Sequence, residues 1–189
     1  MNRLIVISAP SGAGKTTLCH RLLTDIPALE LSISTTTRAP RGAEQNGREY
    51  WFTSIEEFKK KIEAGRFAEW ALVHGNYYGT SKDVIEAVFS RGKSVLLDID
   101  VQGAESLRKA YPSECFSIFI SPPSLEILEQ RLRARRTDTE DAIAKRMKNS
   151  KTEMDEKHRF HKLVVNEELE TAYQQLEAFV SQALQGGTP

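Results

Sequence analysis

The sequence lacks three features that would each indicate a particular class of protein: clustered cysteines, an excess of one charge, and long apolar runs. Its two cysteines, Cys19 and Cys115, lie far apart, which argues against a disulfide framework or a zinc site and predicts two buried free thiols. The 26 basic and 26 acidic residues cancel, so we expect no nucleic-acid partner, and any anion site must be local. No apolar run reaches the length of a membrane span or a signal-peptide core, so we expect no membrane contact and a cytoplasmic location.

What the sequence does contain is an alternation of strand-like and helix-like segments over most of its 189 residues. Short apolar runs rich in β-branched residues predict strands at 4–8, 29–34, 94–100, 116–121 and 162–166. Apolar residues at helical spacing predict helices at 15–26, 54–65, 80–92, 124–136, 140–159 and 169–184. This alternation predicts a single domain with an α/β fold, in which helices flank a parallel sheet.

The segment from Thr35 to Tyr78 interrupts the alternation. It contains turn residues and the runs YWF and AEWALV, which predict a small insert with short strands of its own. Within the insert, Ser54 and Glu57 have capping-box spacing at the start of a helix that ends at Gly65.

A glycine-rich turn, APSGAGKT, links the first predicted strand to the first predicted helix. It matches the phosphate-loop pattern G-x-x-x-x-G-K-[ST], except that Ala9 replaces the first glycine. Gly12 and Gly14 let the backbone curl so that its N–H groups point toward one spot, at the N-terminus of the following helix. Lys15 is placed to reach the β- and γ-phosphates, and the Thr16 hydroxyl to ligate Mg²⁺. The residues expected to bind ATP here are Ala9, Pro10, Ser11, Gly12, Ala13, Gly14, Lys15, Thr16 and Thr17.

The alternative for this turn is a chance glycine-rich connection, but its position between a buried strand and a helix favours nucleoside-triphosphate binding. The segment LLDID supplies a second feature, because it ends the predicted strand 94–100 in two carboxylates. Asp98 is placed to hold Mg²⁺, directly or through water. A strand that ends in solvated acids is the alternative for Asp98, and the nearby phosphate loop favours the metal role.

The segment SISTTTRAPRG gathers five hydroxyl side chains and then two arginines, Arg38 and Arg41. Two tyrosines follow, Tyr50 in GREYWF and Tyr78 in GNYYGTS. Guanidinium forks together with phenol donors suit a phosphate monoester. For the arginines alone, a solvated loop is an equally good interpretation.

Six segments, taken in order, resemble the guanylate kinase family, whose members phosphorylate GMP to GDP with ATP. They are SAPSGAGKT, STTTRAPRGAEQNGREYWF, EWALVHGNYYGTS, LLDIDVQG, RLRARRTDTEDAIAKRM and VVN, and the match runs from Leu4 to about Leu184. The resemblance implies Mg²⁺-dependent transfer of the γ-phosphoryl group of ATP to GMP. We also expect dGMP to serve as acceptor, because no residue identified from the sequence grips the ribose 2′-hydroxyl.

The resemblance also implies a division of the chain into a core at about 1–34, 80–125 and 160–189, a GMP-binding α+β insert at about 35–79, and a helical lid at about 126–159. The GMP contacts that it implies are Ser34, Arg38, Arg41, Tyr50, Glu69, Tyr78, Gly79, Thr80 and Asp100. The implied catalytic cations are Lys15, Arg38, Arg135 and Arg146, helped by Arg131, and Asn166 is expected near the adenine.

The guanine contacts have a chemical basis in the hydrogen-bonding pattern of the base. Guanine presents N1–H and N2–H₂ donors, and a carboxylate such as Glu69 can accept from both, whereas adenine would leave it unsatisfied. The hydroxyls of Ser34 and Thr80 can donate to guanine O6.

Two other functions fit parts of the sequence. One is a non-catalytic guanylate-kinase-like module that binds protein partners, but such modules have degraded phosphate loops, whereas Lys15, Thr16 and Asp98 are all present. The other is a phosphate-loop kinase for another small phosphorylated acceptor, and the pairing of Glu69 with Asp100 favours guanine over that.

Overall fold

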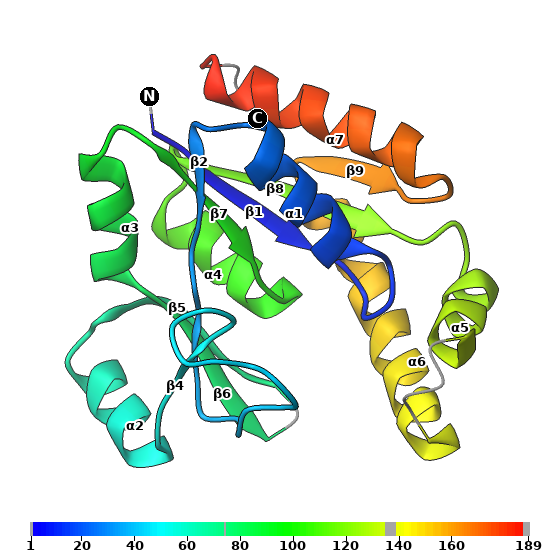
Figure 1. Cartoon of the computed structure of the whole chain (residues 1–189), viewed down its shortest axis with the longest axis horizontal. Coiled ribbons are helices and arrows are strands. Elements are labelled where there is room, and N and C mark those ends of the chain that lie inside the picture. The colour runs from blue at the N-terminus through cyan, green and yellow to red at the C-terminus, as the bar shows by residue number, and fades with distance from the viewer. Residues whose placement is uncertain (1, 74, 135–138, 187–189) are drawn as a thin grey trace.

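A five-stranded parallel sheet forms the centre of the computed structural model, which describes residues 2–73, 75–134 and 139–186 (Figure 1). Its strands are β1 (Leu4–Ser8), β2 (Leu29–Leu31), β7 (Ser94–Asp98), β8 (Cys115–Ser121) and β9 (Lys162–Val165). They lie in the order β2-β7-β1-β8-β9, and every neighbouring pair is parallel. The predicted α/β fold is therefore confirmed.

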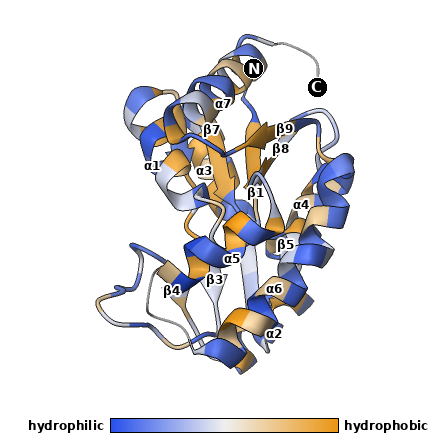
Figure 2. Ribbon diagram, turned by 90° about the vertical axis from the view of Figure 1, so that its right-hand side faces the viewer, coloured by the Kyte–Doolittle hydropathy of each residue, from blue (hydrophilic) through white to orange (hydrophobic). Residues whose placement is uncertain are grey.

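Helices cover both faces of this sheet, and the alternation of side chains along each strand divides the core between them. The helices are α1 (Lys15–Asp25), α3 (Lys82–Ser90), α4 (Val101–Ala110) and α7 (Leu169–Leu184). Because successive strand residues point to opposite faces, Ile5 packs with α1 and α7, whereas Leu4 packs with α3 and α4. Figure 2 shows the central strands as the hydrophobic interior between helices that are polar on their outer turns. Both cysteines are buried and free, as predicted.

Three strands are shorter than predicted, β9 by one residue, and one helix was missed. β2 stops at Leu31, and β7 stops at Asp98 because Asp100 leaves the sheet to cap α4. The Oδ1 atom of Asp100 accepts hydrogen bonds from the N–H groups of Gln102 and Gly103 at 2.8 and 3.2 Å. Helix α4 escaped prediction because a glycine interrupts its first turn and its apolar face is narrow.

The insert forms a second sheet in the order β4-β3-β6-β5. Its elements are β3 (Thr35–Thr36), β4 (Trp51–Phe52), α2 (Ile55–Glu63), β5 (Phe67–Val73) and β6 (Asn76–Ser81). The predicted cap of α2 is confirmed, because the Ser54 hydroxyl accepts from the Glu57 N–H at 3.1 Å. Phe58 of α2 is fully buried and stacks on Phe67, with ring centroids 4.4 Å apart. This sheet therefore has a small apolar core of its own.

Two helices, α5 (Leu125–Ala134) and α6 (Glu140–Asp155), stand across from the second sheet, and a short 3₁₀ turn (Glu156–Arg159) follows α6. In Figure 1 the second sheet and α2 lie at the lower left of the molecule, while α5 and α6 lie at the lower right. Among the described residues, no helix is both long enough and apolar enough to cross a membrane.

Replacing Phe58 with alanine tests whether the second sheet depends on this core. We expect Phe58→Ala to lower the free energy of unfolding by about 3–5 kcal/mol, because it leaves a cavity against Phe67. Trp70 in the same sheet is the control, since its side chain is 44% exposed and Trp70→Ala should cost much less. Urea unfolding of both variants measures the difference, and equal losses would contradict this description of the packing.

Candidate active site

The phosphate-binding turn predicted from the sequence lies between β1 and α1 and is closely packed. Gly12 and Gly14 have φ values of +102° and +94°, which side chains with a Cβ rarely adopt. A Cβ at Gly14 would also lie 2.3 Å from the Nδ2 atom of Asn166. That amide group donates a hydrogen bond of 2.7 Å to the carbonyl of Ala13. Asn166 thus stabilises the turn through this hydrogen bond, a structural role that was not predicted from the sequence.

Lys15 forms an ion pair with Asp98 across the ends of two neighbouring strands. Burial alone would lower the pKa of Lys15, but the Asp98 carboxylate outweighs it and holds that pKa above its usual value. Lys15 is therefore charged at neutral pH and positioned beside the turn. The pair links the two features that the sequence analysis assigned to ATP and Mg²⁺.

A cavity of about 410 Å³ opens between the turn and the second sheet. On one side it is lined by Ala9, Pro10, Ser11, Gly12, Gly14, Lys15, Thr16, Thr17, Asp98 and Ile99. On the other it is lined by Ser34, Tyr50, Glu69, Val73 and Tyr78, with Asp100 and Glu153 completing the boundary. Most residues predicted to bind ATP and GMP thus face one shared space, although they come from segments far apart in the sequence.

Glu69 is the most deeply buried acid of this cavity, with 6% of its surface exposed. Its Oε1 atom accepts a hydrogen bond of 2.6 Å from the Thr80 hydroxyl. Burial raises the pKa of Glu69 to about 7; the Thr80 hydrogen bond opposes this rise and the Asp100 carboxylate adds to it. The backbone of α4 passes close by, since a Cβ at Gly103 would lie 2.7 Å from the Oε2 atom of Glu69.

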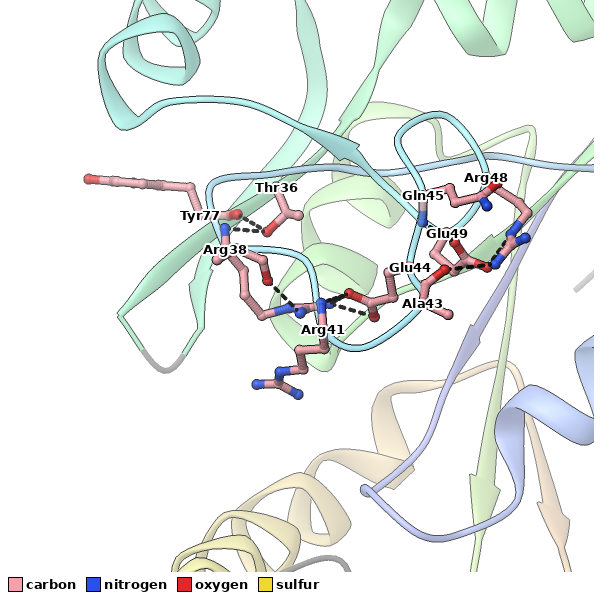
Figure 3. Close-up of polar contacts among 10 residues, drawn as sticks. Thr36, Arg38, Arg41, Ala43, Glu44, Gln45, Arg48, Glu49 and Tyr77 are labelled. Carbon is pink, nitrogen blue, oxygen red and sulfur yellow. Dashed lines mark hydrogen bonds and ion pairs between the residues drawn. The ribbon is translucent and has the colours of Figure 1, made fainter.

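Arg38 and Arg41 lie in the loop after β3, where both donate hydrogen bonds to Glu44 (Figure 3). The Nη2 atom of Arg38 donates to the two carboxylate oxygens of Glu44 at 2.9 and 3.0 Å, and the Arg41 N–H donates to Glu44 Oε2 at 2.8 Å. The Arg41 side chain is exposed and points away from Glu44 in Figure 3. The Arg38 guanidinium lies 5.2 Å from the ring centre of Tyr50, which in turn packs edge-on against Tyr78. The structure therefore brings Arg38, Tyr50 and Tyr78 together beside the cavity, whereas the Arg41 side chain is exposed.

The remaining predicted residues lie around this space. Gly79 and Thr80 are buried in β6 behind the cavity wall, and a Cβ at Gly79 would lie 3.0 Å from the rings of Phe58 and Phe67. Arg131 of α5 donates to the carbonyls of Asn166 and Glu167 at 3.0 and 3.3 Å. Arg146 of α6 donates to the Ser11 hydroxyl at 2.7 Å, so it reaches the phosphate-binding turn. Arg135 lies outside the described residues.

Comparison with known proteins identifies the family. A family model described as guanylate kinase matches residues 1–183. The chain belongs to the guanylate kinase family. A guanylate kinase of Idiomarina loihiensis is 49% identical over 182 residues, which cover 95% of this chain and 86% of that protein. One from Helicobacter pylori is 51% identical over 167 residues, or 88% and 81% of the two chains. The predicted resemblance is confirmed.

The crystal structure of a guanylate kinase from Anaplasma phagocytophilum shares this architecture. It aligns with a TM-score of 0.79 at 31% sequence identity and covers 97% of this chain and 86% of its own. The guanylate kinase fold thus extends over both sheets and the helices that flank them.

Two acids of this guanylate kinase family member were missed by the sequence analysis. Glu44 follows Arg41 by three residues, so an acid in a basic loop was a signal that was available. Glu153 lines the cavity from α6, seven residues after Arg146 and therefore two turns along the same helix face. Neither acid belongs to a short motif, and only the folded chain shows what each one faces.

The raised pKa of Glu69 predicts how stability changes with pH. Its pKa is about 7 in the folded protein against 4.5 for a free group, so the folded state binds the proton more tightly. The free energy of unfolding therefore falls as pH rises from about 4.5 to 7, and the loss persists above pH 7. Glu69→Gln removes this ionisation, so we expect the variant to match wild type at pH 5 and to melt higher at pH 8. The expected gain is about 2–4 °C for each kcal/mol removed.

Thermal melts of the ligand-free protein between pH 5 and 8 measure this difference. Glu63→Gln is the matched control, because Glu63 is exposed on α2 and should leave the wild-type pH dependence unchanged. A Glu69→Gln variant that follows the same pH curve as wild type would show that Glu69 is not the group responsible.

Proposed function

We propose that this chain transfers the γ-phosphoryl group of ATP to GMP and releases ADP and GDP. The observation that carries the proposal is the single cavity with two unlike sides. A phosphate-binding turn with a charged lysine forms one side, and a deeply buried carboxylate suited to guanine lies on the other. Family membership supports the same reaction.

On the donor side, the backbone N–H groups of the turn and the ammonium group of Lys15 hold the ATP phosphates. The Thr16 hydroxyl and the Asp98 carboxylate are oxygen donors of the kind that Mg²⁺ prefers, and both face the cavity, so the residues fit this metal. When bound, Mg²⁺ neutralises charge on the β- and γ-phosphate oxygens. In this proposal Lys15 leaves its partner Asp98 and contacts the phosphate oxygens when ATP is bound.

On the acceptor side, the buried Glu69 carboxylate accepts from guanine N1–H and N2–H₂. Thr80 already donates its hydroxyl proton to Glu69, so its part is to orient that carboxylate, and the Ser34 hydroxyl is left to donate to O6. Asp100 is held by two backbone N–H groups, which fixes its carboxylate beside the base. Adenine would leave these buried acceptors unpaired, and such mismatches cost about 10⁴-fold in catalytic efficiency.

The acceptor phosphate binds to Arg38, Arg41 and the phenol groups of Tyr50 and Tyr78. Its second pKa is about 6, so at neutral pH it is largely a dianion and needs no general base to attack the γ-phosphorus. The obstacle is repulsion between two anions, which the surrounding cations neutralise. An arginine in such a place contributes about 10³-fold or more to the rate.

Arg146 completes this set from α6 across the cavity, and we propose that Arg135, which lies outside the described residues, acts with it. Arg146 already contacts the phosphate-binding turn through Ser11, and Arg135 precedes α6 along the chain. In this proposal 126–159 act as a lid that excludes water, 35–79 form the GMP-binding part, and the rest is the core. Because ATP and GMP are cytoplasmic metabolites and both thiols are free, we place the enzyme in the cytoplasm.

An acceptor screen tests the proposed function directly. We expect ADP release from Mg·ATP with GMP to exceed that with AMP, UMP or CMP by about 10⁴-fold in kcat/KM, because only guanine satisfies the buried acceptors. Lys15→Ala should abolish transfer while GMP binding, measured by calorimetry, stays intact. Equal rates with AMP, or no turnover with GMP, would refute the assignment.

The Glu44 contacts predict a separate effect on the acceptor phosphate. Glu44→Gln should raise KM for GMP about 10-fold with little change in kcat, because Arg38 loses the charged partner that holds it in place. Glu49→Gln is the matched control, since Glu49 pairs with Arg48 in the same loop (Figure 3). Steady-state kinetics with GMP as the varied substrate measures both, and equal effects would mean that the loop fold matters rather than Arg38.

A further inference from the structure

Glu153 is a half-buried acid that lines the cavity and has no part in the proposed phosphoryl transfer. It projects from the last turns of α6 and lines both the main cavity and an adjoining hollow of about 260 Å³. The two spaces share three lining residues, Val73, Asp100 and Glu153. Glu153 therefore lies at the junction, opposite the second sheet and next to the acid that faces the guanine position.

The surroundings of Glu153 favour a hydrogen-bonding role. Burial raises the pKa of its carboxyl group to about 7; Lys15 opposes the rise, and Asp100 adds to it. Among the described residues, the structure records no hydrogen-bond donor for this carboxyl group. A half-buried carboxylate that faces a cavity gains from a ligand that supplies a hydrogen-bond donor there.

The position of the acceptor nucleotide indicates which ligand group arrives there. In the proposed function its base lies by Glu69 and its phosphate by Tyr50 and Tyr78, and these three residues line one cavity, so we infer that its ribose spans the space between them. Val73 and Asp100 flank both this space and Glu153. An acidic side chain that accepts from a ribose 2′-hydroxyl is an established form of nucleoside recognition.

We propose that the Glu153 carboxylate accepts a hydrogen bond from the 2′-hydroxyl of the acceptor nucleotide and so makes the enzyme favour GMP over dGMP. This inference rests on the proposed GMP kinase function and adds a specificity-determining residue to it. dGMP remains an acceptor, but it leaves the Glu153 carboxylate without that donor.

A part in metal binding is the competing explanation, since Glu153 lies within electrostatic reach of Lys15. The described residues contain no group of three or more acids, histidines or cysteines placed to share an ion. Asp98, which the proposed function assigns to Mg²⁺, and Glu153 belong to no such group, and Asp100 is held by the backbone N–H groups at the start of α4. The ribose role is therefore the better supported of the two.

Helix α6 links this contact to the phosphates. Arg146 and Glu153 lie on the same helix face, and Arg146 already reaches Ser11 of the phosphate-binding turn. Any closer approach of α6 to the turn thus carries both side chains into the cavity, one toward the phosphates and one toward the ribose.

The test compares GMP with dGMP in wild type, Glu153→Ala and Glu153→Gln. We expect wild type to prefer GMP about 10-fold in kcat/KM, and Glu153→Ala to lose about 10-fold with GMP while dGMP changes less than about 2-fold. Glu153→Gln retains an amide oxygen that can accept, so part of the preference should return. Asp155→Ala is the matched control, because Asp155 is exposed on the same helix and should leave the ratio unchanged.

Calorimetric affinities for GMP and dGMP give a second readout that does not depend on turnover. Equal losses with the two nucleotides in Glu153→Ala would overturn the inference, and an accompanying rise in the Mg²⁺ requirement would assign Glu153 to the metal. If wild type turns over GMP but shows no preference over dGMP, only the inference fails. If wild type does not turn over GMP at all, the proposed function fails as well.

Discussion

The parallel pairing of β1 with β7 is the constraint on which the site depends. In this register Ile7 lies beside Asp98, so the turn that follows β1 and the acid that ends β7 emerge side by side. Lys15 then pairs with Asp98 across the gap. The carboxyl edge of a parallel sheet is where such folds bind ligands, and the second sheet and α6 face each other across this edge.

The site contains two acids whose burial is unfavourable for folding. Glu69 is buried with a raised pKa, and Glu153 is half-buried with a pKa similarly raised to about 7. The apolar core on both sides of the sheet compensates for their burial, since it is formed by fully buried strand and helix residues. In the proposals above, the substrate supplies hydrogen-bond donors to both carboxylates. The burial of these acids therefore lowers the free energy of unfolding but gives selectivity for guanine and for ribose.

The sequence predicted the parts of the molecule that have strong local signals. Gly12, Gly14 and Lys15 stand at fixed spacing between a strand and a helix, and Ser54 with Glu57 fixes the start of α2, so both features were found. Helix α4 was missed because its apolar face is narrow and Asp100, its cap, read as the end of a strand.

Contacts between distant segments could not be predicted in the same way. Glu153 faces Asp100 across 53 positions of sequence, and only the placement of α6 against the start of α4 brings the two acids to one cavity. The hydrogen bond from Asn166 to the Ala13 carbonyl is a further case, since it joins the segments that follow β1 and β9. Short motifs report local backbone geometry, whereas these contacts depend on the packing of whole elements.

Direct phosphoryl transfer requires that one cavity hold two nucleotides at once, ATP on the phosphate-binding turn and GMP against the second sheet. Calorimetric titration of GMP into the protein, alone and saturated with Mg²⁺ and a non-hydrolysable ATP analogue, tests this most directly. We expect one GMP site per chain in both titrations, with equal or higher affinity when the analogue is bound. Displacement of GMP by the analogue would show that the two nucleotides compete for one site and cannot react there.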